Sequence, residues 1–207
     1  MPGGRKKEGK RARRILLCAS GGYIVYSLPR IILQLVHHFA DDVQVVLSRA
    51  AAKLVSPHAV EVASRNKVFI EMEDTGGGIY VPHIELGRNV DLVVVFPATV
   101  NIIGKVANGI ADELISALIF ATEAPVLFLP DTNDTMVNHP AVQRNIEQLR
   151  ADGYIVLPRI EGPEVATREN MDGFGDVFPI PSLLLQMSAA LADPQTRGVA
   201  RRSIKKT

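Results

Sequence analysis

The sequence predicts an α/β fold: a single domain with one doubly wound parallel sheet that is flanked by helices. Two observations predict this fold. Short apolar runs alternate along the chain with segments whose apolar residues recur at helical spacing. The run DLVVVFPA, residues 91–98, is continuously apolar, which is typical of a parallel strand that helices cover on both faces.

Individual strands and helices follow from the same patterns. The first strand, 15–19, ends before a glycine pair and leads into a helix over 23–39. The later strands are expected at 43–48, 91–98, 124–130 and 153–158, and the later helices at 57–64 and 139–153. Right-handed crossovers then place the carboxyl ends of all these strands along one edge of the sheet.

Composition and charge favour one soluble domain with basic ends. The 207 residues suit one substantial core, and no apolar run reaches the roughly 18 residues that a membrane span needs. Residues 15–196 hold 11 basic and 21 acidic side chains, a net charge of −10, while the other 12 basic residues lie at the two ends. We expect tails at 1–14 and 193–207 around a domain at 15–192. Disordered, solvated tails are favoured over tails that bind nucleic acid or an acidic partner.

The only cysteine, Cys18, lies in the apolar run of the first strand. A buried structural thiol is therefore favoured over a reactive one. One thiol cannot form an intramolecular disulfide, and no signal-peptide cleavage pattern follows the N-terminal basic run. A reducing cytoplasm fits these features.

Small and polar residues follow the expected strands. They are Ser20, Gly21 and Gly22 after the first, Ser48 after the second, Pro97, Ala98, Thr99 and Asn101 after the third, and 130–133 after the fourth. Open α/β sheets bind ligands at this edge, so these groups form a candidate site. Glycine amides could bind an anion there, with Ser20 or Ser48 supplying hydroxyls. The usual dinucleotide and P-loop motifs are absent.

Among the five histidines, His83 is distinctive because it follows three consecutive glycines and begins the sequence HIEL. A structural role and a catalytic role both remain open on this pattern, since imidazole titrates near neutral pH. No Cys/His or carboxylate spacing resembles a metal site, and no serine nucleophile elbow is present.

Taken in order, SGG, HIEL, FPATVNIIGKVANGIADEL and PDTNDTMVNHP resemble the motifs of the homo-oligomeric flavin-containing cysteine decarboxylases. This family includes phosphopantothenoylcysteine decarboxylase and the lantibiotic-type enzymes that decarboxylate the C-terminal cysteine of ribosomal peptides. The resemblance covers residues 14–191 and implies a Rossmann-like, flavodoxin-like flavoprotein domain. It also implies trimers, or a dodecamer of four trimers, with the flavin between subunits. FMN is the expected flavin and FAD is the alternative.

The resemblance assigns roles to the polar strand ends. Gly21, Gly22 and Ser48 would bind the flavin phosphate and ribityl chain beside Ser20, while Pro97, Ala98, Thr99 and Asn101 would line the flavin. The glycines of the segment after Asn101, Gly104 and Gly109, would permit close packing. Its charged and amide residues Lys105, Asn108 and Asp112 would make helix and subunit contacts.

The resemblance also assigns the chemistry. His83 would be the catalytic base, and Asn133 would hold the substrate carboxylate. Met136 matches the second methionine of the family motif P-x-M-N-x-x-M-W, which falls on residues 130–137. Thr132 and Val137 replace the first Met and the Trp of that motif, so packing around the substrate must differ.

The expected substrate follows from a missing cysteine. In the pantothenate-pathway members, a flexible segment of A-C-G-D type closes over the substrate and supplies a cysteine that helps to reduce the oxidised enethiol. The corresponding stretch here, EVATRENMDGFGD, has none. We therefore expect oxidation and decarboxylation of the C-terminal cysteine of a precursor peptide, giving an aminoenethiol on the way to S-aminovinyl-cysteine. Residues 161–176 would clamp the substrate, and lanthionine-forming enzymes would be partners.

Three alternatives remain beside this reading. The first is the phosphopantothenoylcysteine decarboxylase of coenzyme A synthesis, and the second is a non-catalytic flavin-fold binding protein. The presence of both His83 and Asn133 argues against the second. The third, a prenyl-flavin-making relative, is disfavoured by HIEL and by the P-x-x-N segment.

Overall fold

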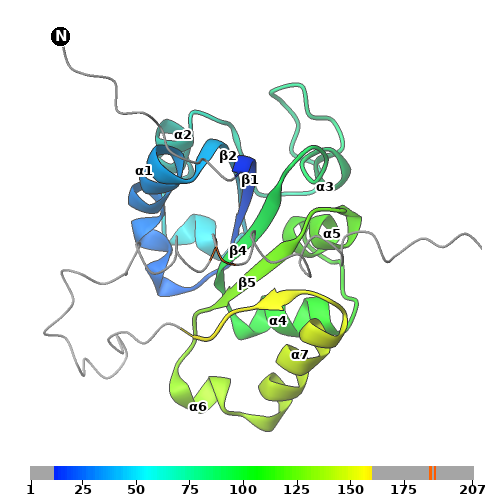
Figure 1. The fold of residues 1–207 in the computed structure, drawn as a ribbon. Helices are drawn as coiled ribbons and strands as arrows, with labels where there is room; N and C mark the ends of the chain where they lie inside the picture. The colour runs from blue at the N-terminus through cyan, green and yellow to red at the C-terminus, as the bar shows by residue number, and fades with distance from the viewer. Residues whose placement is uncertain (1–11, 160–186, 188, 190–207) are drawn as a thin grey trace, which may run out of the picture.

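The computed structural model describes residues 12–159, 187 and 189 and confirms the predicted α/β fold (Figure 1). In this part of the chain, six parallel strands form one sheet in the order β3-β2-β1-β4-β5-β6. The strands are β1 (Ala12–Ala19), β2 (Ala40–Leu47), β3 (Val68–Phe69), β4 (Leu92–Ala98), β5 (Val126–Pro130) and β6 (Ile155–Val156). The order changes direction between β1 and β4, which is where open α/β sheets bind their ligands.

Helices connect the strands, and local sequence sets where several of them begin. The α-helices are α1 (Leu28–His38), α2 (Pro57–Ser64), α3 (Pro82–Glu85), α4 (Val100–Ala107), α5 (Leu114–Ala121), α6 (Asp134–Val137) and α7 (Pro140–Ala151). Two 3-10 helices, η1 (Tyr23–Ser27) and η2 (Ala51–Lys53), follow β1 and β2. Proline stands at the start of α2, α3 and α7, where a missing backbone N–H leaves no helical hydrogen bond unmade.

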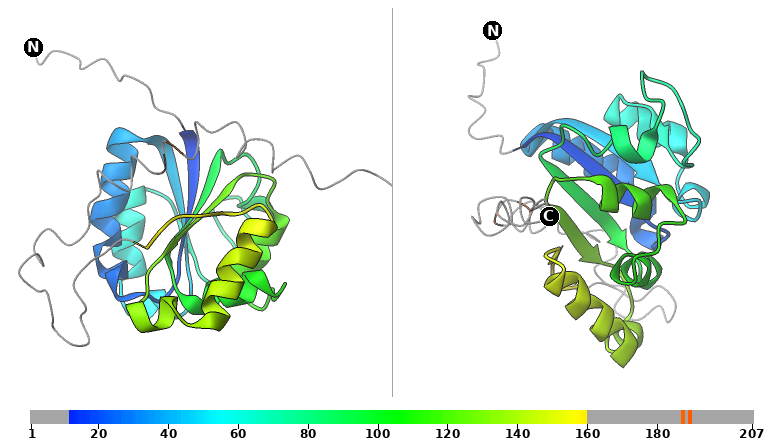
Figure 2. Two further views of the ribbon diagram at one scale, coloured as in Figure 1. Left: turned by 60° about the horizontal axis from the view of Figure 1, so that its bottom comes forward. Right: turned by 90° about the vertical axis from the view of Figure 1, so that its right-hand side faces the viewer.

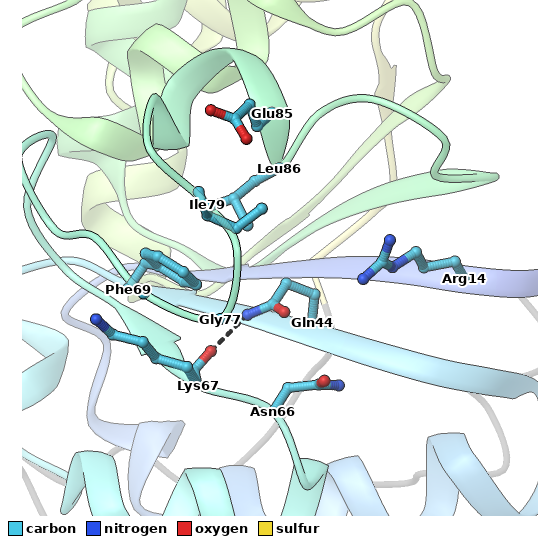
Figure 3. Close-up of a pocket in the computed structure, with 10 residues that line it drawn as sticks. Arg14, Gln44, Asn66, Lys67, Phe69, Gly77, Ile79, Glu85 and Leu86 are labelled. Atoms are coloured by element: carbon cyan, nitrogen blue, oxygen red, sulfur yellow. Dashed lines mark hydrogen bonds between the residues drawn. The ribbon is translucent and has the colours of Figure 1, made fainter.

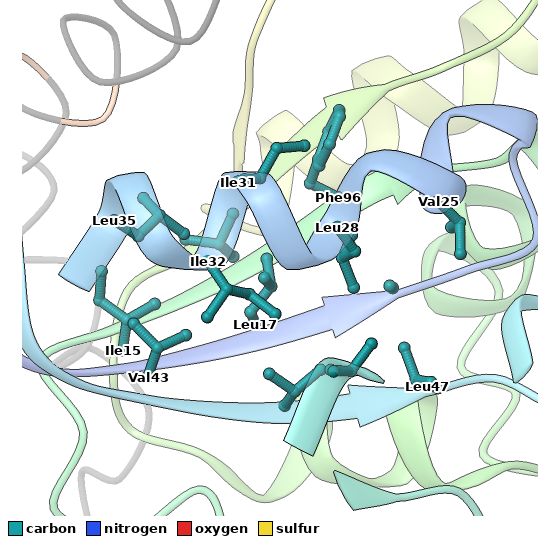
Figure 4. Packing of buried hydrophobic residues seen from close by; sticks show 14 of the residues in the cluster. Ile15, Leu17, Val25, Leu28, Ile31, Ile32, Leu35, Val43, Leu47 and Phe96 are labelled. Carbon is teal, nitrogen blue, oxygen red and sulfur yellow. The ribbon is translucent and has the colours of Figure 1, made fainter. Parts of the chain in front are cut away.

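Helices cover both faces of the sheet, as the two views of Figure 2 show, and an apolar layer lies between the sheet and the helices on each face. One layer joins α1 and α2 to alternate residues of the strands, such as Leu17, Val45 and Val94 (Figure 4). The other joins α4, α5 and α7 to the residues between them, such as Leu16 and Val95. All seven residues of β4 are buried. The continuous apolar run that predicted a strand covered on both faces therefore has its expected environment.

Some boundaries differ from those expected. β3 was not predicted, because two apolar residues are too short a run to distinguish from a loop. The expected helix over 23–39 begins as a separate 3-10 turn. β1 starts at Ala12, inside the expected basic tail, and Arg14 pairs there with Asp42 through a 2.9 Å contact between Nε and Oδ2. The predicted clamp at 161–176 and the tail at 193–207 lie outside the described residues.

The segment after β4 corrects one prediction about its glycines. Gly109 follows α4 with a φ of +70°, and no described residue lies within 4 Å of where its Cβ would be, so within this part of the chain it supplies a backbone conformation and not close packing. Gly104 faces α7, where an added methyl would lie 3.5 Å from Asn145 Nδ2. Lys105 pairs with Asp112 and Glu113 at 2.9 and 3.0 Å, which agrees with a structural role. None of the described helices is long and apolar enough to cross a membrane.

Candidate functional site at the carboxyl edge of the sheet

Ser20 joins the ends of the two central strands. Its buried hydroxyl donates to the Pro97 carbonyl oxygen at 2.7 Å, accepts the Thr99 backbone N–H at 2.9 Å and lies 3.0 Å from the Thr99 hydroxyl. A serine hydroxyl has one proton and two acceptor lone pairs. Since its proton is used on Pro97, Thr99 must donate the third bond. Ser20, predicted to bind the cofactor, is therefore fully engaged within the protein.

The glycine pair forms a close-packed surface next to Ser20. A Cβ on Gly21 would lie 2.6 Å from the Ala50 Cβ, and a Cβ on Gly22 would lie 2.3 Å from the Asp131 carboxylate and 2.9 Å from Pro97. The Gly22 amide bonds the Ser20 carbonyl at 2.8 Å. Within the described part of the chain, the Gly21 amide has no such partner. Neither glycine position therefore has room for a side chain, and the Gly21 amide can donate to a ligand.

Ser48 and Asn101 present polar groups to the same edge. The Ser48 amide continues the sheet by bonding the Ala19 carbonyl at 2.9 Å, and its hydroxyl oxygen accepts from the Ala51 amide at 3.1 Å. That contact leaves the Ser48 hydroxyl proton available to a ligand. Asn101 lies exposed in the first turn of α4. Ala98, by contrast, is buried, and its carbonyl accepts the Asp131 amide at 3.1 Å.

Asn133 is held by the helix that follows it. Its Oδ1 accepts the Met136 amide at 2.8 Å, so the side chain caps α6. This bond assigns Oδ1 to the helix and leaves the Nδ2 donors free. Met136 is 44% exposed, and the buried Thr132 hydroxyl has no hydrogen-bond partner in the part of the chain that the structure describes. The loop therefore offers donors and an orphaned hydroxyl beside the glycine surface.

Two charged residues lie near Asn133: Asp131, which belongs to the predicted strand-end segment 130–133 but was given no individual role, and Arg159, which was not predicted. Asp131 lies against Gly22, and burial raises the pKa of its carboxyl above the ordinary value while the positive charge of Arg159 opposes that shift. Arg159 donates to the Thr132 carbonyl at 2.9 Å and pairs with Asp134. Asp131 occupies a variable position of the family motif at 130–137, and Arg159 lies outside the motifs, 27 residues after Thr132 in the sequence.

His83 lies in a different part of the molecule. It stands in the one-turn helix α3, where Glu85 Oε1 accepts the Tyr80 and Val81 amides at 3.1 and 2.6 Å. Figure 1 shows α3 and α6 far apart, so the structure does not bring His83 and Asn133 together within one chain. Within residues 12–159, 187 and 189, the buried His83 Nδ1 has no hydrogen-bond partner. The sequence could not reveal this separation, because the motif order contains no distances.

A small polar pocket lies beside α3 instead of at the carboxyl edge (Figure 3). Its volume is about 110 Å³, and its lining includes Gln44, Lys67, Phe69 and Glu85. Gln44 Nε2 donates to the Lys67 carbonyl at 2.6 Å across its floor. None of the residues predicted to bind cofactor or substrate lines this pocket.

Comparison with known proteins gives the family. Residues 4–184 match the model of the family described as Flavoprotein. The chain belongs to this family. The flavoprotein is 39% identical to the coenzyme A biosynthesis bifunctional protein CoaBC of Bacillus subtilis over 150 residues, which are 72% of this chain and 37% of CoaBC. It thus spans less than half the length of that relative.

Three further comparisons involve proteins of similar length to this chain. The mersacidin decarboxylase of Bacillus sp. strain HIL-Y85/54728 is 36% identical over 148 residues, covering 70% of this chain and 75% of that enzyme. The solved MrsD from the same strain has a TM-score of 0.72 at 30% identity and covers 86% and 96% of the two chains. The FMN-dependent cysteine decarboxylase SpaF has a TM-score of 0.67 at 29% identity, with 85% and 97% covered.

The carboxyl edge fits a flavin. The Gly21 amide and the Ser48 hydroxyl can donate to a phosphate at this edge. The open side chains of Asn101 and Asn133 add further hydrogen-bonding groups. In the described residues, no three His, Cys, Asp or Glu side chains are grouped to hold a metal ion.

Proposed function

We propose that this flavoprotein uses FMN to oxidise and decarboxylate the C-terminal cysteine of a ribosomal precursor peptide. The product would be a peptidyl aminoenethiol, the precursor of an S-aminovinyl-cysteine ring. Family membership and the likeness to an FMN-dependent cysteine decarboxylase support FMN. The likeness to mersacidin decarboxylase supports a peptide substrate.

The observation that carries the proposal is the position of Cys18. It is the only cysteine of the chain and lies in the middle of the sheet, paired in register with Val46 on β2 and Val95 on β4. Its side chain is fully buried, and burial raises the pKa of the thiol. A thiol so enclosed cannot reach a substrate to reduce an enethiol. The oxidised product is therefore released as it forms.

The reaction balances as follows. The cysteine loses the thiol proton and a hydride from Cβ, which gives a thioaldehyde. The C–C bond to the carboxylate then breaks, CO₂ leaves, and its electron pair is delocalised through the C=S group to give the enethiolate. A bound flavin supplies the hydride acceptor. The peptide loses CO₂ and two hydrogens overall, about 46 Da.

His83 and Asn133 would supply the protein's part of this chemistry. His83 can take the thiol proton at a ring nitrogen, and its buried Nδ1 has no hydrogen-bond partner among the described residues. The free Asn133 Nδ2 can donate to the substrate carboxylate while Oδ1 remains bonded to Met136. A neutral amide orients the carboxylate without the strong ground-state binding of an arginine, which suits a group that must leave as neutral CO₂.

The separation of α3 from α6 implies that one chain does not complete the site. We propose that His83 of one copy acts beside Asn133 of another in a trimer or dodecamer. The motif resemblance supports such an assembly. In this proposal, the enzyme works in the cytoplasm beside lanthionine-forming enzymes.

The test is a mass assay with peptides that end in Cys. Wild-type protein should remove about 46 Da, and His83→Asn should retain the yellow flavin while turnover falls by roughly 10²–10⁴. His139→Asn is a matched control, because asparagine can replace the His139 Nδ1 that caps α7. Loss of CO₂ alone, about 44 Da, or full turnover by His83→Asn, would defeat the proposal.

The second candidate is phosphopantothenoylcysteine decarboxylase, which the 39% identity to CoaBC favours. Its net reaction removes CO₂ without net oxidation, so it requires a step that returns the electrons. Activity on the pantothenoyl substrate with no action on Cys-terminated peptides would establish this alternative. The same mass assay therefore separates the two candidates.

A further inference from the structure

Arg159 contacts the residues on both sides of Asn133. Its Nη1 donates to the Thr132 carbonyl at 2.9 Å, and its Nη2 pairs with Asp134 Oδ1. The Arg159 side chain is only 23% exposed, whereas that of Asp134 is 77% exposed. Arg159 follows β6, so its side chain connects the segment after the last strand of the sheet to the loop after β5.

This contact restricts the conformation of Asn133. A planar guanidinium donates in fixed directions, so bonding one group before Asn133 and one after it limits rotation of the intervening backbone. The side chain is separately fixed by the bond from the Met136 amide. Together the two constraints direct the free Nδ2 donors, which are the groups proposed to hold the substrate carboxylate.

The charge of Arg159 is also restrained. A guanidinium free to turn toward a carboxylate would bind it by paired, charge-assisted hydrogen bonds. In this structure Asp134 takes one of its amino groups and the Thr132 carbonyl takes the other. A positive charge therefore lies beside the carboxylate site but is engaged elsewhere.

We propose that Arg159 is a positioning residue for the carboxylate-binding Asn133, and that Asp134 keeps the Arg159 charge from binding the substrate carboxylate directly. This inference rests on the proposed function for its kinetic consequences. Its structural part, the ordering of residues 131–138 by Arg159, does not depend on that function.

The first experiment measures ordering without turnover. Millisecond hydrogen–deuterium exchange of the flavin-loaded protein should show faster exchange in the peptide containing Met136 for Arg159→Gln, by about threefold or more. Arg150→Gln is the matched control, because Arg150 also joins a carboxylate, Glu147, to a backbone carbonyl, that of Val156. Unchanged exchange in Arg159→Gln would overturn the positioning role.

The second experiment measures opposite changes in KM for a Cys-terminated peptide. Arg159→Gln should raise KM about tenfold while kcat stays within about threefold of the wild type. The reason is that Asn133 binds the carboxylate equally in the ground state and the transition state, and both would be weakened. Asp134→Asn frees the guanidinium, so KM should fall and kcat should fall with it. Arg159→Lys should recover little, because an ammonium cannot bond both groups in the same geometry. A rise in KM for Asp134→Asn would overturn the charge role.

The two experiments separate failure of this inference from failure of the proposed function. If the wild-type protein acts on no Cys-terminated peptide, the proposed function fails and the kinetic role of Asp134 fails with it. The exchange measurement still decides whether Arg159 orders the Asn133 loop. If the wild type is active and neither variant changes exchange or KM, the inference alone is wrong.

Discussion

The end of β1 and the loop after β5 lie on one edge of the same sheet, but their polar groups are used differently. At the end of β1, Ser20 makes all three of its hydroxyl contacts to Pro97 and Thr99. After β5, neither the buried Thr132 hydroxyl nor the Asn133 Nδ2 has a hydrogen-bond partner among the described residues. The Ser20 side chain is therefore fully bonded before any ligand arrives, and the side chains after β5 are not. This difference suits a cofactor that stays bound beside a substrate that exchanges.

The largest expected effect comes from adding a side chain at Gly22, where the end of β1 is already closely packed. Gly22→Ala would place a methyl 2.3 Å from the Asp131 carboxylate and 2.9 Å from Pro97. Overpacking of this kind destabilises by about 1–3 kcal/mol, and the shifted strand ends should no longer bind flavin. Absorbance at visible wavelengths after purification, together with urea unfolding, measures both effects.

Gly104→Ala is the control for that substitution. Its methyl would meet Asn145 Nδ2 at an ordinary 3.5 Å, and alanine favours a helix over glycine by about 1 kcal/mol. This variant should remain yellow and be at least as stable as the wild type. If Gly22→Ala retains the flavin absorbance and the unfolding free energy of the wild type, the close packing at the end of β1 is not needed for flavin binding or for stability.

A smaller effect should separate two serines on the same edge. Ser20→Ala leaves the Thr99 amide and the Pro97 carbonyl without their bonds to the hydroxyl, which costs about 1–3 kcal/mol. Ser48→Ala loses one hydrogen bond, from the Ala51 amide to the Ser48 hydroxyl, which contributes about 1 kcal/mol, but also removes the hydroxyl proton that a phosphate can accept. Unfolding of the flavin-free proteins should rank Ser20→Ala as the less stable.

Flavin titration then provides the second half of the comparison. Loss of the Ser48 hydroxyl should weaken FMN more than the loss of stability accounts for, by about tenfold in Kd, since a hydrogen bond to a charged group contributes about 1.5 kcal/mol or more. Equal Kd values for FMN in titrations of the Ser48→Ala and wild-type proteins would contradict a phosphate contact at Ser48.

Much of the fold and part of the site could be predicted because their signals are local. The apolar run of β4, the proline before α7 and the glycine pair after β1 each indicate their structure within a few residues of sequence. The motif around Asn133 likewise predicts a polar loop at a strand end. The structure adds that the Asn133 side chain caps α6 by accepting a hydrogen bond from the Met136 amide.

Other features depend on contacts between distant segments and could not be predicted from the sequence. The Ser20 hydroxyl donates to Pro97, which lies 77 residues later in the sequence, and Arg159 bonds Thr132, which lies 27 residues earlier. A serine after a strand looks the same in sequence whether its hydroxyl is bonded or free. The two-residue strand β3 has too few side chains to show a period. The distance between His83 and Asn133 likewise needs the three-dimensional structure.

The smallest expected effect concerns Asp131, the acidic residue between the two regions. Burial raises the pKa of its carboxyl from the ordinary 3.8, and Arg159 only partly opposes this. Between pH 3.8 and the raised pKa, the native state binds more protons than the unfolded state, so this carboxyl lowers stability as pH rises through that window. Asp131→Asn should therefore equal the wild type in stability near pH 3. At pH 7 it should gain up to about 1 kcal/mol, measured by urea unfolding.

Asp134→Asn, which removes an exposed carboxylate and its pair with Arg159, should show no such gain at pH 7. Lower stability of Asp131→Asn at pH 7 would mean that the Asp131 carboxylate is stabilised and belongs with the saturated groups around Ser20.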